Sequence, residues 1–381
     1  MSRPSRQPVL CVVGARPNYM KMAPLLRAMA AEPQAPPTFL CHTGQHYDPA
    51  LNRDLFVDLK MPEPNINLEV GSGSQSVQTA EIMKRFEPVV ERIRPSCVIV
   101  VGDVNSTLAC SLVAVKMGVP VVHVEAGLRS YDRSMPEEIN RVLTDQISDV
   151  LYTSERGAHA NLLREGIAEE RIHFVGNIMI DSLLEAMKFA VAPRETLRRE
   201  GWGALAIDGA TGYALVTLHR PSNVDDVESL RQVVSILDAV SERLPVVWPL
   251  HPRTAANLQR CGLDQQWINS RVARLAPVGY LEMAGLMKQA KVVVTDSGGV
   301  QEETTALGVP CLTMRPNTER PVTVEQGTNT LVPRTRDAVL DCIEDILANG
   351  GKRGRIPELW DGQTAVRIAR HLTIWITQRN P

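Results

Sequence analysis

The chain has 381 residues, enough for two domains that each bury a core, and 44% hydrophobic and 22% charged residues are ordinary proportions for a folded protein. A formal net charge of −2 without long runs of one sign argues against a nucleic-acid surface or a polybasic membrane patch. No stretch approaches the roughly 18 apolar residues of a spanning helix, and the start lacks the apolar run of a signal peptide. We expect a cytoplasmic protein with a small-molecule partner and no membrane or nucleic-acid partner.

The seven cysteines are scattered, odd in number and mostly set in apolar runs. No CxxC pair or Cys/His cluster has the spacing of a zinc site. We interpret the cysteines as reduced thiols and predict no metal site.

Short apolar segments alternate with helical segments through the first half of the chain. Continuous apolar strands between amphipathic helices are typical of a parallel sheet covered by helices on both faces. The predicted strands and helices are, in order, VLCVVG (9–14), NYMKMAPLLRAMAAE (18–32), TFLCHTG (38–44), DPALNRDLFVDL (48–59), CVIVVGD (97–103), STLACSLVAVKMG (106–118), PVVHVEAG (120–127), PEEINRVLTDQIS (136–148), VLYTS (150–154) and ERGAHANLLREG (155–166).

The alternation weakens over residues 190–212 and then restarts. We therefore predict an α/β protein of two Rossmann-like, doubly wound domains, residues 1–177 and 178–362, with an active-site cleft lined by the carboxyl ends of strands. The second series reads YALVTLH (213–219), VESLRQVVSILDAVSERL (227–244), PVVWPLH (245–251), GYLEMAGLMKQA (279–290), KVVVTDSGG (291–299) and VPCLTM (309–314).

Acidic residues follow the strands of the first half. Asp103 ends one strand, Glu125 ends the next, and Glu137 and Glu138 open the helix after Pro136. These carboxylates are candidate proton carriers, and we expect their proximity to keep acid and base forms together near neutral pH. Glu138 alone is better explained as a residue that caps the helix start.

The stretch TDSGGVQEE predicts a strand-to-helix turn that holds a phosphorylated ligand. Gly298 and Gly299 let the backbone approach a ligand closely, and the amides of Ser297 to Gly299 are expected to point at a diphosphate. One turn later, Glu302 or Glu303 can accept hydrogen bonds from a pair of sugar hydroxyls.

Basic residues and histidines also follow predicted strands. Arg16, in GARP at a helix start, is a candidate anion contact, although the motif can also be a plain turn. Arg129 and Arg141 can equally be local ion-pair partners. His219 and His251 each precede an arginine within two residues, and His219 suits a phosphate or a leaving oxygen better than a structural role alone.

Several common motifs are missing. GSGSQS (71–76) lacks the last glycine of GxGxxG and a preceding strand, which weakens a nicotinamide interpretation. The absence of GxxxxGK[ST] argues against a P-loop kinase, and the absence of GxSxG around Ser297 argues against a hydrolase triad.

A set of motifs, in order from about residue 11 to 330, resembles the non-hydrolysing UDP-N-acetylglucosamine 2-epimerases of bacteria and archaea. The motifs are GARP…KMAP, TGQHYD, VGDVNSTLA, HVEAGLRSYDRSMPEEINR, VGN…ID, VTLHR, HPRT, PVGYLE, TDSGGVQEE and NTERPVTVEQGTN. The resemblance implies a fold of the glycosyltransferase-B type, a homodimer, and a final helix, 363–381, that packs back on the first domain. It also implies interconversion of UDP-N-acetylglucosamine and UDP-N-acetylmannosamine without a metal or redox cofactor.

The resemblance also assigns residues by their positions in the matched motifs. The proton carriers would be Asp103, Glu125 and Glu137, with His219 catalytic or in contact with phosphate, and Glu303 would bind the ribose. The full set of expected substrate-binding residues is Arg16, Lys21, Arg141, His251, Ser297, Gly298, Gly299, Glu303 and Arg320.

One residue departs from the family pattern: Asn18 stands where members commonly have glutamate. A second possible substrate is therefore UDP-2,3-diacetamido-2,3-dideoxy-glucuronate, on which a relative in the same family acts. A glycosyltransferase on the same fold and a non-catalytic sensor of UDP-sugars are two further hypotheses for the function.

Overall fold

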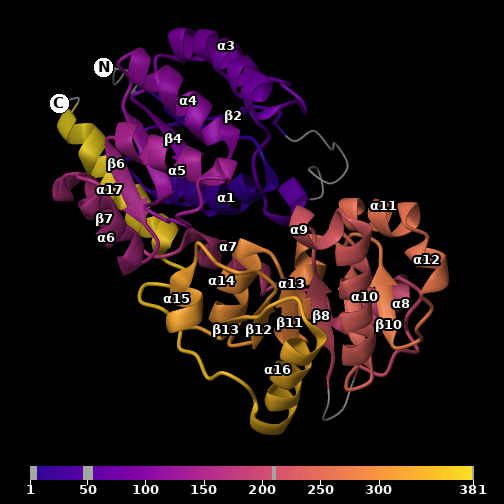
Figure 1. The fold of residues 1–381 in the computed structure, drawn as a ribbon. Coiled ribbons are helices and arrows are strands. Elements are labelled where there is room, and N and C mark those ends of the chain that lie inside the picture. The colour runs from indigo at the N-terminus through magenta and orange to yellow at the C-terminus, as the bar shows by residue number, and fades with distance from the viewer. Residues whose placement is uncertain (1–6, 46–54, 208–211, 380–381) are drawn as a thin grey trace. The chain divides into compact units, whose positions relative to one another are not determined.

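The computed structural model describes residues 7–45, 55–207 and 212–379. The chain forms two compact units: unit 1, residues 1–184 with 358–381, and unit 2, residues 185–357. Each unit holds a parallel sheet flanked by helices (Figure 1). The predicted α/β class with two doubly wound domains is confirmed. Part of the helix expected over 48–59 and part of the TGQHYD motif lie outside the described residues.

Unit 1 contains a seven-stranded sheet in the order β3-β2-β1-β4-β5-β6-β7. Its elements are β1 (Val9–Val13), α1 (Arg16–Ala31), β2 (Thr38–His42), β3 (Ile66–Asn67), α3 (Gln75–Ile93), β4 (Cys97–Val101), α4 (Asn105–Lys116), β5 (Val121–Ala126), α5 (Pro136–Ile147), β6 (Val150–Thr153), α6 (Arg156–Arg164), the 3₁₀ helix η1 (Glu169–Arg171), β7 (Ile172–Phe174) and α17 (Thr364–Arg379), with α7 (Ile178–Ala186) at its boundary with unit 2.

The order of strands in unit 1 reverses between β1 and β4, which pair in parallel. In doubly wound sheets such a reversal opens a crevice at the carboxyl ends of the two strands, because their following helices cover opposite faces. The segments that emerge there begin at Gly14 after β1 and at Gly102 after β4. The sheet topology therefore places Arg16 and Asp103 at the same edge.

The core of unit 1 explains why its strands are mostly apolar. Alternate residues of a strand face opposite sides of a sheet, and Leu10 and Val12 pack in one cluster with Phe86 of α3. Cys11 and Ile99, which have the other orientation, are also fully buried. Both faces are covered, so most strand positions before the strand ends are apolar, with His123 of β5 a buried exception.

Unit 2 contains a six-stranded sheet in the order β10-β9-β8-β11-β12-β13, with the reversal between β8 and β11. Its elements are α8 (Pro193–Arg199), β8 (Ala214–Thr217), α9 (Pro221–Val224), α10 (Val227–Ser241), β9 (Val246–Pro249), α11 (Pro252–Arg260), α12 (Leu263–Gln266), β10 (Val272–Leu275), α13 (Tyr280–Gln289), β11 (Val292–Thr295), α14 (Gly298–Leu307), β12 (Cys311–Thr313), α15 (Pro321–Glu325), β13 (Asn329–Leu331) and α16 (Arg336–Asn349).

The sheet of unit 2 is also covered on both faces. Val216 of β8 packs with Val233 of α10 and Ile343 of α16, whereas the adjacent Leu215 packs with Leu286 of α13. The reversal between β8 and β11 brings the segments after Thr217 and Thr295 to one edge. These segments carry the predicted histidine and the predicted glycine turn.

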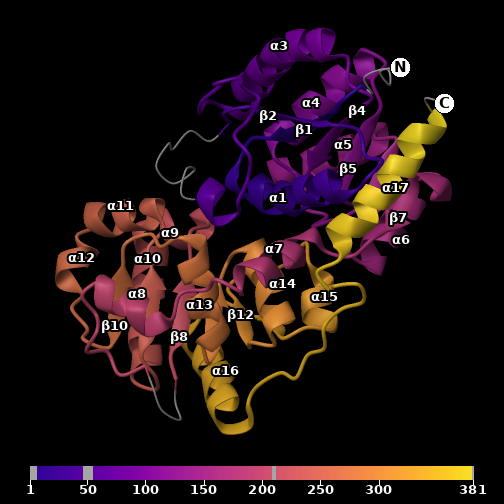
Figure 2. The ribbon, with the colours of Figure 1, turned by 180° about the vertical axis from the view of Figure 1, so that it is seen from behind.

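The C-terminal helix α17 belongs to unit 1 although it follows unit 2 in the chain. It packs against α1, and both ribbon views show it lying along this unit (Figures 1 and 2). Its buried face includes Ile368 and Leu372. The domain boundaries expected after residues 177 and 362 stay predictions.

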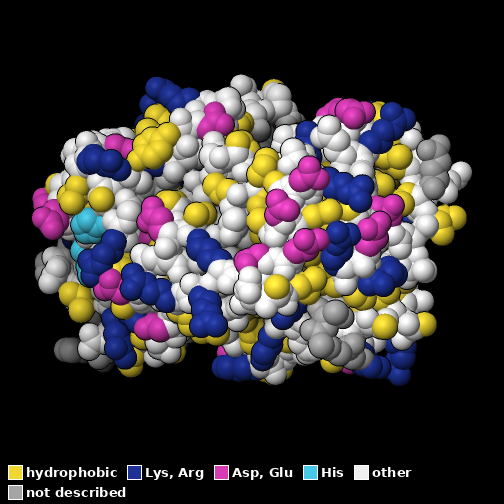
Figure 3. All heavy atoms as spheres, turned by 60° about the horizontal axis from the view of Figure 1, so that its bottom comes forward, with side chains coloured by type: hydrophobic (Ala, Val, Ile, Leu, Met, Phe, Trp, Pro, Cys, Tyr) yellow, Lys and Arg dark blue, Asp and Glu magenta, His cyan; other side chains and the backbone are white. Residues whose placement is uncertain are grey.

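All seven cysteines fall in the described residues and are free thiols. Burial raises the pKa of Cys41 to about 12, which keeps that thiol protonated. Among the described residues, no helix is both long and apolar enough to cross a membrane. Lysine and arginine side chains alternate with acidic ones over the face drawn in Figure 3.

Gly285 of α13 provides a test of the packing in unit 2. A Cβ atom at this position would lie 1.9 Å from the carbonyl oxygen of Val191, so the backbone of one segment rests directly on the helix. Overpacking of this kind costs about 1–3 kcal/mol, more than the roughly 0.5–1 kcal/mol that alanine gains over glycine inside a helix. We predict that Gly285→Ala lowers the free energy of unfolding, measured by urea denaturation.

Gly203→Ala is the matched control, because a Cβ there would meet its nearest neighbour, Arg198 Cα, at 3.5 Å. That variant should be as stable as the unmodified chain. Equal stability of the Gly285 and Gly203 variants would contradict the packing described for α13.

Candidate active site

Glu125 stands at a β-bulge at the end of β5. Its φ is +73°, and the pairing of β5 with β6 shifts register between Val124 and Ala126. A left-handed backbone is uncommon for a residue with a side chain, and bulges near active sites commonly re-aim one side chain. The carboxylate forms an ion pair with Lys21 of α1, and both side chains are about 95% buried. The bulge therefore turns Glu125 toward α1.

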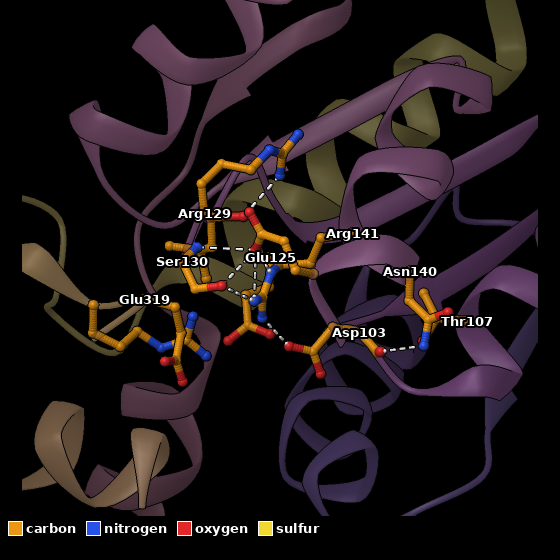
Figure 4. Close-up of polar contacts among 12 residues, drawn as sticks. Asp103, Thr107, Glu125, Arg129, Ser130, Asn140, Arg141 and Glu319 are labelled. Atoms are coloured by element: carbon orange, nitrogen blue, oxygen red, sulfur yellow. Dashed lines mark hydrogen bonds and ion pairs between the residues drawn. The ribbon is translucent and has the colours of Figure 1, made fainter. Parts of the chain in front are cut away.

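Asp103 follows β4 and faces a cation on α5. Its Oδ2 lies 2.5 Å from Nη1 of Arg141, whose Nη2 is 2.8 Å from Oε2 of Glu138. The side-chain amide of Asn140 donates to the Asp103 carbonyl at 2.9 Å. Figure 4 shows both α5 residues directed at Asp103. Helix α5 thus holds the backbone and the carboxylate of this residue.

Gly102 lies against the Lys21–Glu125 ion pair and directly precedes Asp103, which belongs to the other pair. A Cβ atom on Gly102 would lie 2.9 Å from Lys21 Nζ and 3.3 Å from Glu125 Oε2, so a side chain here would displace the pair. Its φ of +68° is also one that glycine adopts without strain. The Lys21–Glu125 pair therefore lies against the residue that precedes Asp103.

The structure places a cation beside two of the predicted proton carriers. Coexistence of acid and base forms near neutral pH stays a prediction. In unit 1, Glu125 faces Lys21 and Asp103 faces Arg141, so each carboxylate meets a cation. The physical reason is the burial of these groups, since a buried charge requires an opposite charge nearby. The two cations come from helices far from the carboxylates in sequence.

Glu137 and Glu138 occupy the first turn of α5. Burial alone would raise the pKa of Glu138, but the amides of Ser130 and Tyr131, each 2.9 Å away, and the Arg141 guanidinium hold it below its ordinary value. Glu138 thus has a structural role, as expected, but it holds the amides of Ser130 and Tyr131 and does not cap the start of α5. Glu137 is half-buried, makes no hydrogen bond or ion pair with the described residues, and precedes Arg141 by one helical turn on the same face.

Asn18 occupies the turn expected to bind an anion. Its Oδ1 accepts hydrogen bonds from the amides of Gly14 at 3.1 Å and Ala15 at 3.2 Å, and its Nδ2 donates to the Val101 carbonyl at 2.9 Å. Those two amides are therefore engaged, and an anion at this turn would depend on the guanidinium of Arg16, which is half-buried at the start of α1. The sequence marks Asn18 as a departure from the family pattern but does not predict this bridge between β1 and β4.

The glycine turn of unit 2 starts α14, as predicted, with one difference. The Ser297 amide donates to Thr295 Oγ1 at 3.0 Å instead of pointing at a ligand. The amides of Gly298 and Gly299 are at the first two helical positions, where no intrahelical acceptor exists. A Cβ on Gly298 would lie 2.6 Å from Glu319 Oε1, so any larger residue there would require the Glu319 side chain to shift.

The adjacent carboxylates of α14 have different partners. Glu302 Oε1 lies 3.0 Å from Nε of Arg320, whereas Glu303 Oε1 accepts a hydrogen bond from the Tyr280 hydroxyl at 2.9 Å. Burial raises the pKa of Glu303 to about 7, the Tyr280 hydrogen bond opposes this rise, and the charge of Glu302 adds to it. Glu303 can therefore change protonation near neutral pH. Tyr280, in the PVGYLE motif, had no predicted role.

The two predicted histidines lie together. The rings of His219 and His251 are stacked with centroids 5.2 Å apart. Asp296, which the sequence did not single out, lies 3.1 Å from Nδ1 of His219 and accepts the amides of His219 and Arg220 at 3.0 and 2.9 Å. Burial favours the neutral acid, but His219 and the other donors hold the pKa of Asp296 below its ordinary value. The signal available in the sequence was an aspartate at the end of β11.

The comparisons with known proteins identify the family of the chain. Residues 28–373 match the family model described as UDP-N-acetylglucosamine 2-epimerase. A protein of Methanocaldococcus jannaschii with that name is 41% identical over 365 residues, covering 95% of this chain and 98% of the relative. A Pseudomonas aeruginosa protein named UDP-2,3-diacetamido-2,3-dideoxy-D-glucuronate 2-epimerase is 38% identical over 368 residues, covering 96% of this chain and 99% of the relative.

The solved structures include the M. jannaschii UDP-GlcNAc 2-epimerase in complex with UDP-GlcNAc and UDP. Its TM-score to this chain is 0.85 at 39% identity, and the match covers 96% of this chain and 99% of that one. The chain therefore belongs to the UDP-N-acetylglucosamine 2-epimerase family, a family of isomerases with the two-domain glycosyltransferase-B fold.

Proposed function

We propose that this chain interconverts UDP-N-acetylglucosamine and UDP-N-acetylmannosamine. The observation that carries this proposal is the pair of cation-held carboxylates in unit 1, Glu125 with Lys21 and Asp103 with Arg141, placed at the ends of adjacent strands. A protein that only binds a nucleotide sugar does not need buried carboxylates where the sheet ends. Membership of an isomerase family, and a relative crystallised with UDP-GlcNAc and UDP, support the same substrate.

The reaction requires that UDP leaves before the stereocentre is inverted. The C2 proton of the sugar has no neighbouring carbonyl, so direct deprotonation is prohibitively unfavourable. When the bond between C1 and the UDP oxygen breaks, positive charge develops at C1 and makes the C2 proton acidic. A carboxylate removes that proton to give 2-acetamidoglucal and UDP. A carboxylic acid then protonates C2 on the opposite face while UDP re-forms its bond to C1.

In this proposal unit 1 supplies the proton carriers. Asp103, Glu125 and Glu137 are the candidates, and each positioned acid or base typically contributes roughly 10²- to 10⁴-fold in rate. Asp103 and Glu125 each lie beside a cation, Arg141 and Lys21 respectively, that balances the charge of the carboxylate. The reverse reaction uses the same groups with acid and base exchanged.

Unit 2 in turn holds UDP and stabilises it as it departs. The amides of Gly298 and Gly299, at the positive end of α14, are placed to bind a diphosphate. His219, oriented by Asp296, and His251 offer further contacts to phosphate or to the leaving oxygen. Glu303 binds the ribose hydroxyls, and Arg320 is the remaining residue proposed to bind UDP. Fixed donors that stabilise departing charge are commonly the largest contribution to catalysis.

A related substrate, UDP-2,3-diacetamido-2,3-dideoxy-glucuronate, is the second candidate. The P. aeruginosa relative carries that name, and Asn18 departs from the common glutamate at a position beside Gly102. NMR of the products from a panel of UDP-2-acetamido sugars separates the two, because only the true substrate is inverted at C2 with high kcat/KM. The homodimer and the cytoplasmic location stay predictions.

Proton exchange at C2 tests the proposed reaction. Incubation with UDP-N-acetylglucosamine in D₂O should place deuterium at C2 of substrate and product, detected by NMR. Asp103→Asn and Glu125→Gln should each lower kcat by roughly 10²- to 10⁴-fold while leaving the Kd for UDP nearly unchanged. Glu91→Gln, at an exposed position of α3, is the control and should exchange at the normal rate.

Two outcomes contradict the proposal. Sugar transfer to an acceptor without exchange at C2 would identify a glycosyltransferase, and binding of the UDP-sugar with neither exchange nor product would identify a sensor. Near-normal turnover in both carboxylate variants would reject their role as proton carriers.

The role of Glu303 predicts a proton released on UDP binding. The carboxyl, with a pKa of about 7, is partly protonated in the free protein at pH 6.5, and ribose hydroxyls donate to its ionised form. Binding should therefore lower that pKa, release a proton, and make UDP affinity rise from pH 6 to 7.5 and then level off. Calorimetry in buffers of different ionisation enthalpy measures the released proton.

Glu303→Gln separates this effect from the titration of UDP itself. The variant should lose the pH-dependent gain in affinity and bind UDP roughly 10- to 100-fold more weakly, as expected for hydrogen bonds to a charged group. Equal proton release from the variant and the unmodified chain would exclude contact between Glu303 and the ribose.

A further inference from the structure

His123 is a fully buried histidine in the middle of β5. Its ring lies between two hydrogen-bond acceptors. Nε2 is 2.8 Å from the carbonyl oxygen of Gly102, and Nδ1 is 2.7 Å from Oδ1 of Asp145. A carbonyl oxygen only accepts, so Nε2 carries a proton.

The partner on the other side is an ionised carboxylate. Besides His123, Asp145 accepts the Gly127 amide at 3.0 Å and lies 2.7 Å from Nη1 of Arg129. Burial favours its neutral form, yet its pKa lies below the ordinary value, and Arg129 and the Gly127 amide favour the ionised form whatever the charge of His123. An acceptor of three donors has no proton to give to Nδ1, so Nδ1 also carries one.

We propose that His123 is an imidazolium, protonated at both ring nitrogens, that positions the proton carriers of unit 1. It is a positioning residue, since its ring contacts Gly102 and Asp145 and not the candidate catalytic carboxylates. The protonation of His123 follows from the contacts of its ring alone. Its positioning role rests on the proposed epimerase activity.

The charges around the ring balance. We call His123, Arg129, Asp145 and Glu165 the buried charge cluster; Arg129 binds Glu165 through Nε at 2.8 Å and Nη2 at 2.6 Å. Two cations thus meet two anions, the condition under which charges are tolerated inside a protein. On the neighbouring strands, β4 offers His123 the Gly102 carbonyl, and β6 pairs with it through the apolar Leu151.

The cluster ties together the segments that carry the proposed chemistry. Gly102 is fixed on both sides, by its amide to the Val124 carbonyl at 3.0 Å and by its carbonyl to His123, and it directly precedes Asp103. Asp145 holds Gly127, which follows Glu125 by two residues.

Asp145 also follows Arg141, the cation of Asp103, by one turn of α5. A neutral ring would direct a lone pair at a carbonyl or a carboxylate and push one of these segments away. The protonated ring therefore sets the backbone from which Asp103 and Glu125 project.

The protonation state is measurable without any assay of activity. In protein labelled with ¹⁵N-histidine, both ring nitrogens of His123 should show the signature of N–H groups from pH 6 to pH 9. Because the chain has eight histidines, the resonance can be assigned by replacing the other seven one at a time, which leaves His123 intact. A neutral tautomer, or a ring that titrates within this range, would overturn the proposal.

Kinetics test the positioning role. His123→Gln and Asp145→Asn should each lower kcat by roughly 10²-fold, the loss typical of a misplacement of about 1 Å. KM for UDP-N-acetylglucosamine and the Kd for UDP should change little. His159→Gln, on α6 of the same unit, is the control and should keep normal kcat.

The double variant His123→Gln with Asp145→Asn removes one charge of each sign, so it should lose less than the product of the two single losses. Multiplicative losses, or a folded His123→Gln variant with normal kcat, would reject the positioning role. If the unmodified chain showed no epimerase activity, the proposed function would fail, while the NMR result would still decide the state of His123.

Discussion

The buried ion pair between Lys21 and Glu125 is the interaction on which the organisation of unit 1 depends. A carboxylate placed at the end of a strand that is apolar on both faces has little water around it, and its charge must be balanced inside the protein. The cation comes from α1, which follows β1, two strands away from β5 in the sheet. Gly102 leaves the space in which the two side chains meet. Asp103, at the end of the adjacent strand β4, is balanced in the same way by Arg141 of α5.

In the proposed reaction the two units would contribute by different physical means. Unit 1 uses charged side chains, each held by a partner, because proton transfer needs groups that exist in both protonation states. Unit 2 uses the amides at the start of α14 and the His219–Asp296 pair, because a departing diphosphate needs fixed donors. Glu303 differs from Asp103 and Glu125 in its surroundings, since burial and the neighbouring carboxylate Glu302 raise its pKa.

Asn18 shows how a single departure from a family pattern is accommodated. Its amide group donates to the Val101 carbonyl and accepts from two turn amides at once. An ionised carboxylate at this position could accept from the turn but could not donate to the carbonyl, so a glutamate would have to adopt a different arrangement. The residue therefore joins the ends of β1 and β4, the place where the order of strands reverses and where both candidate ion pairs are anchored.

The sequence by itself determined the two doubly wound sheets, the glycine turn of α14 and most candidate residues, because apolar strands and the polar residues that end them are local patterns. It also favoured a structural role for Glu138. The tertiary structure decided the remaining features. These are the bulge at Glu125, the pairing of Asp103 and Glu125 with distant cations, the hydrogen bond from the Ser297 amide to Thr295, and the contributions of Asp296, Tyr280 and His123. Each depends on which side chains meet across strands and helices far apart in the chain, and on the burial that makes an unpaired charge or donor costly there.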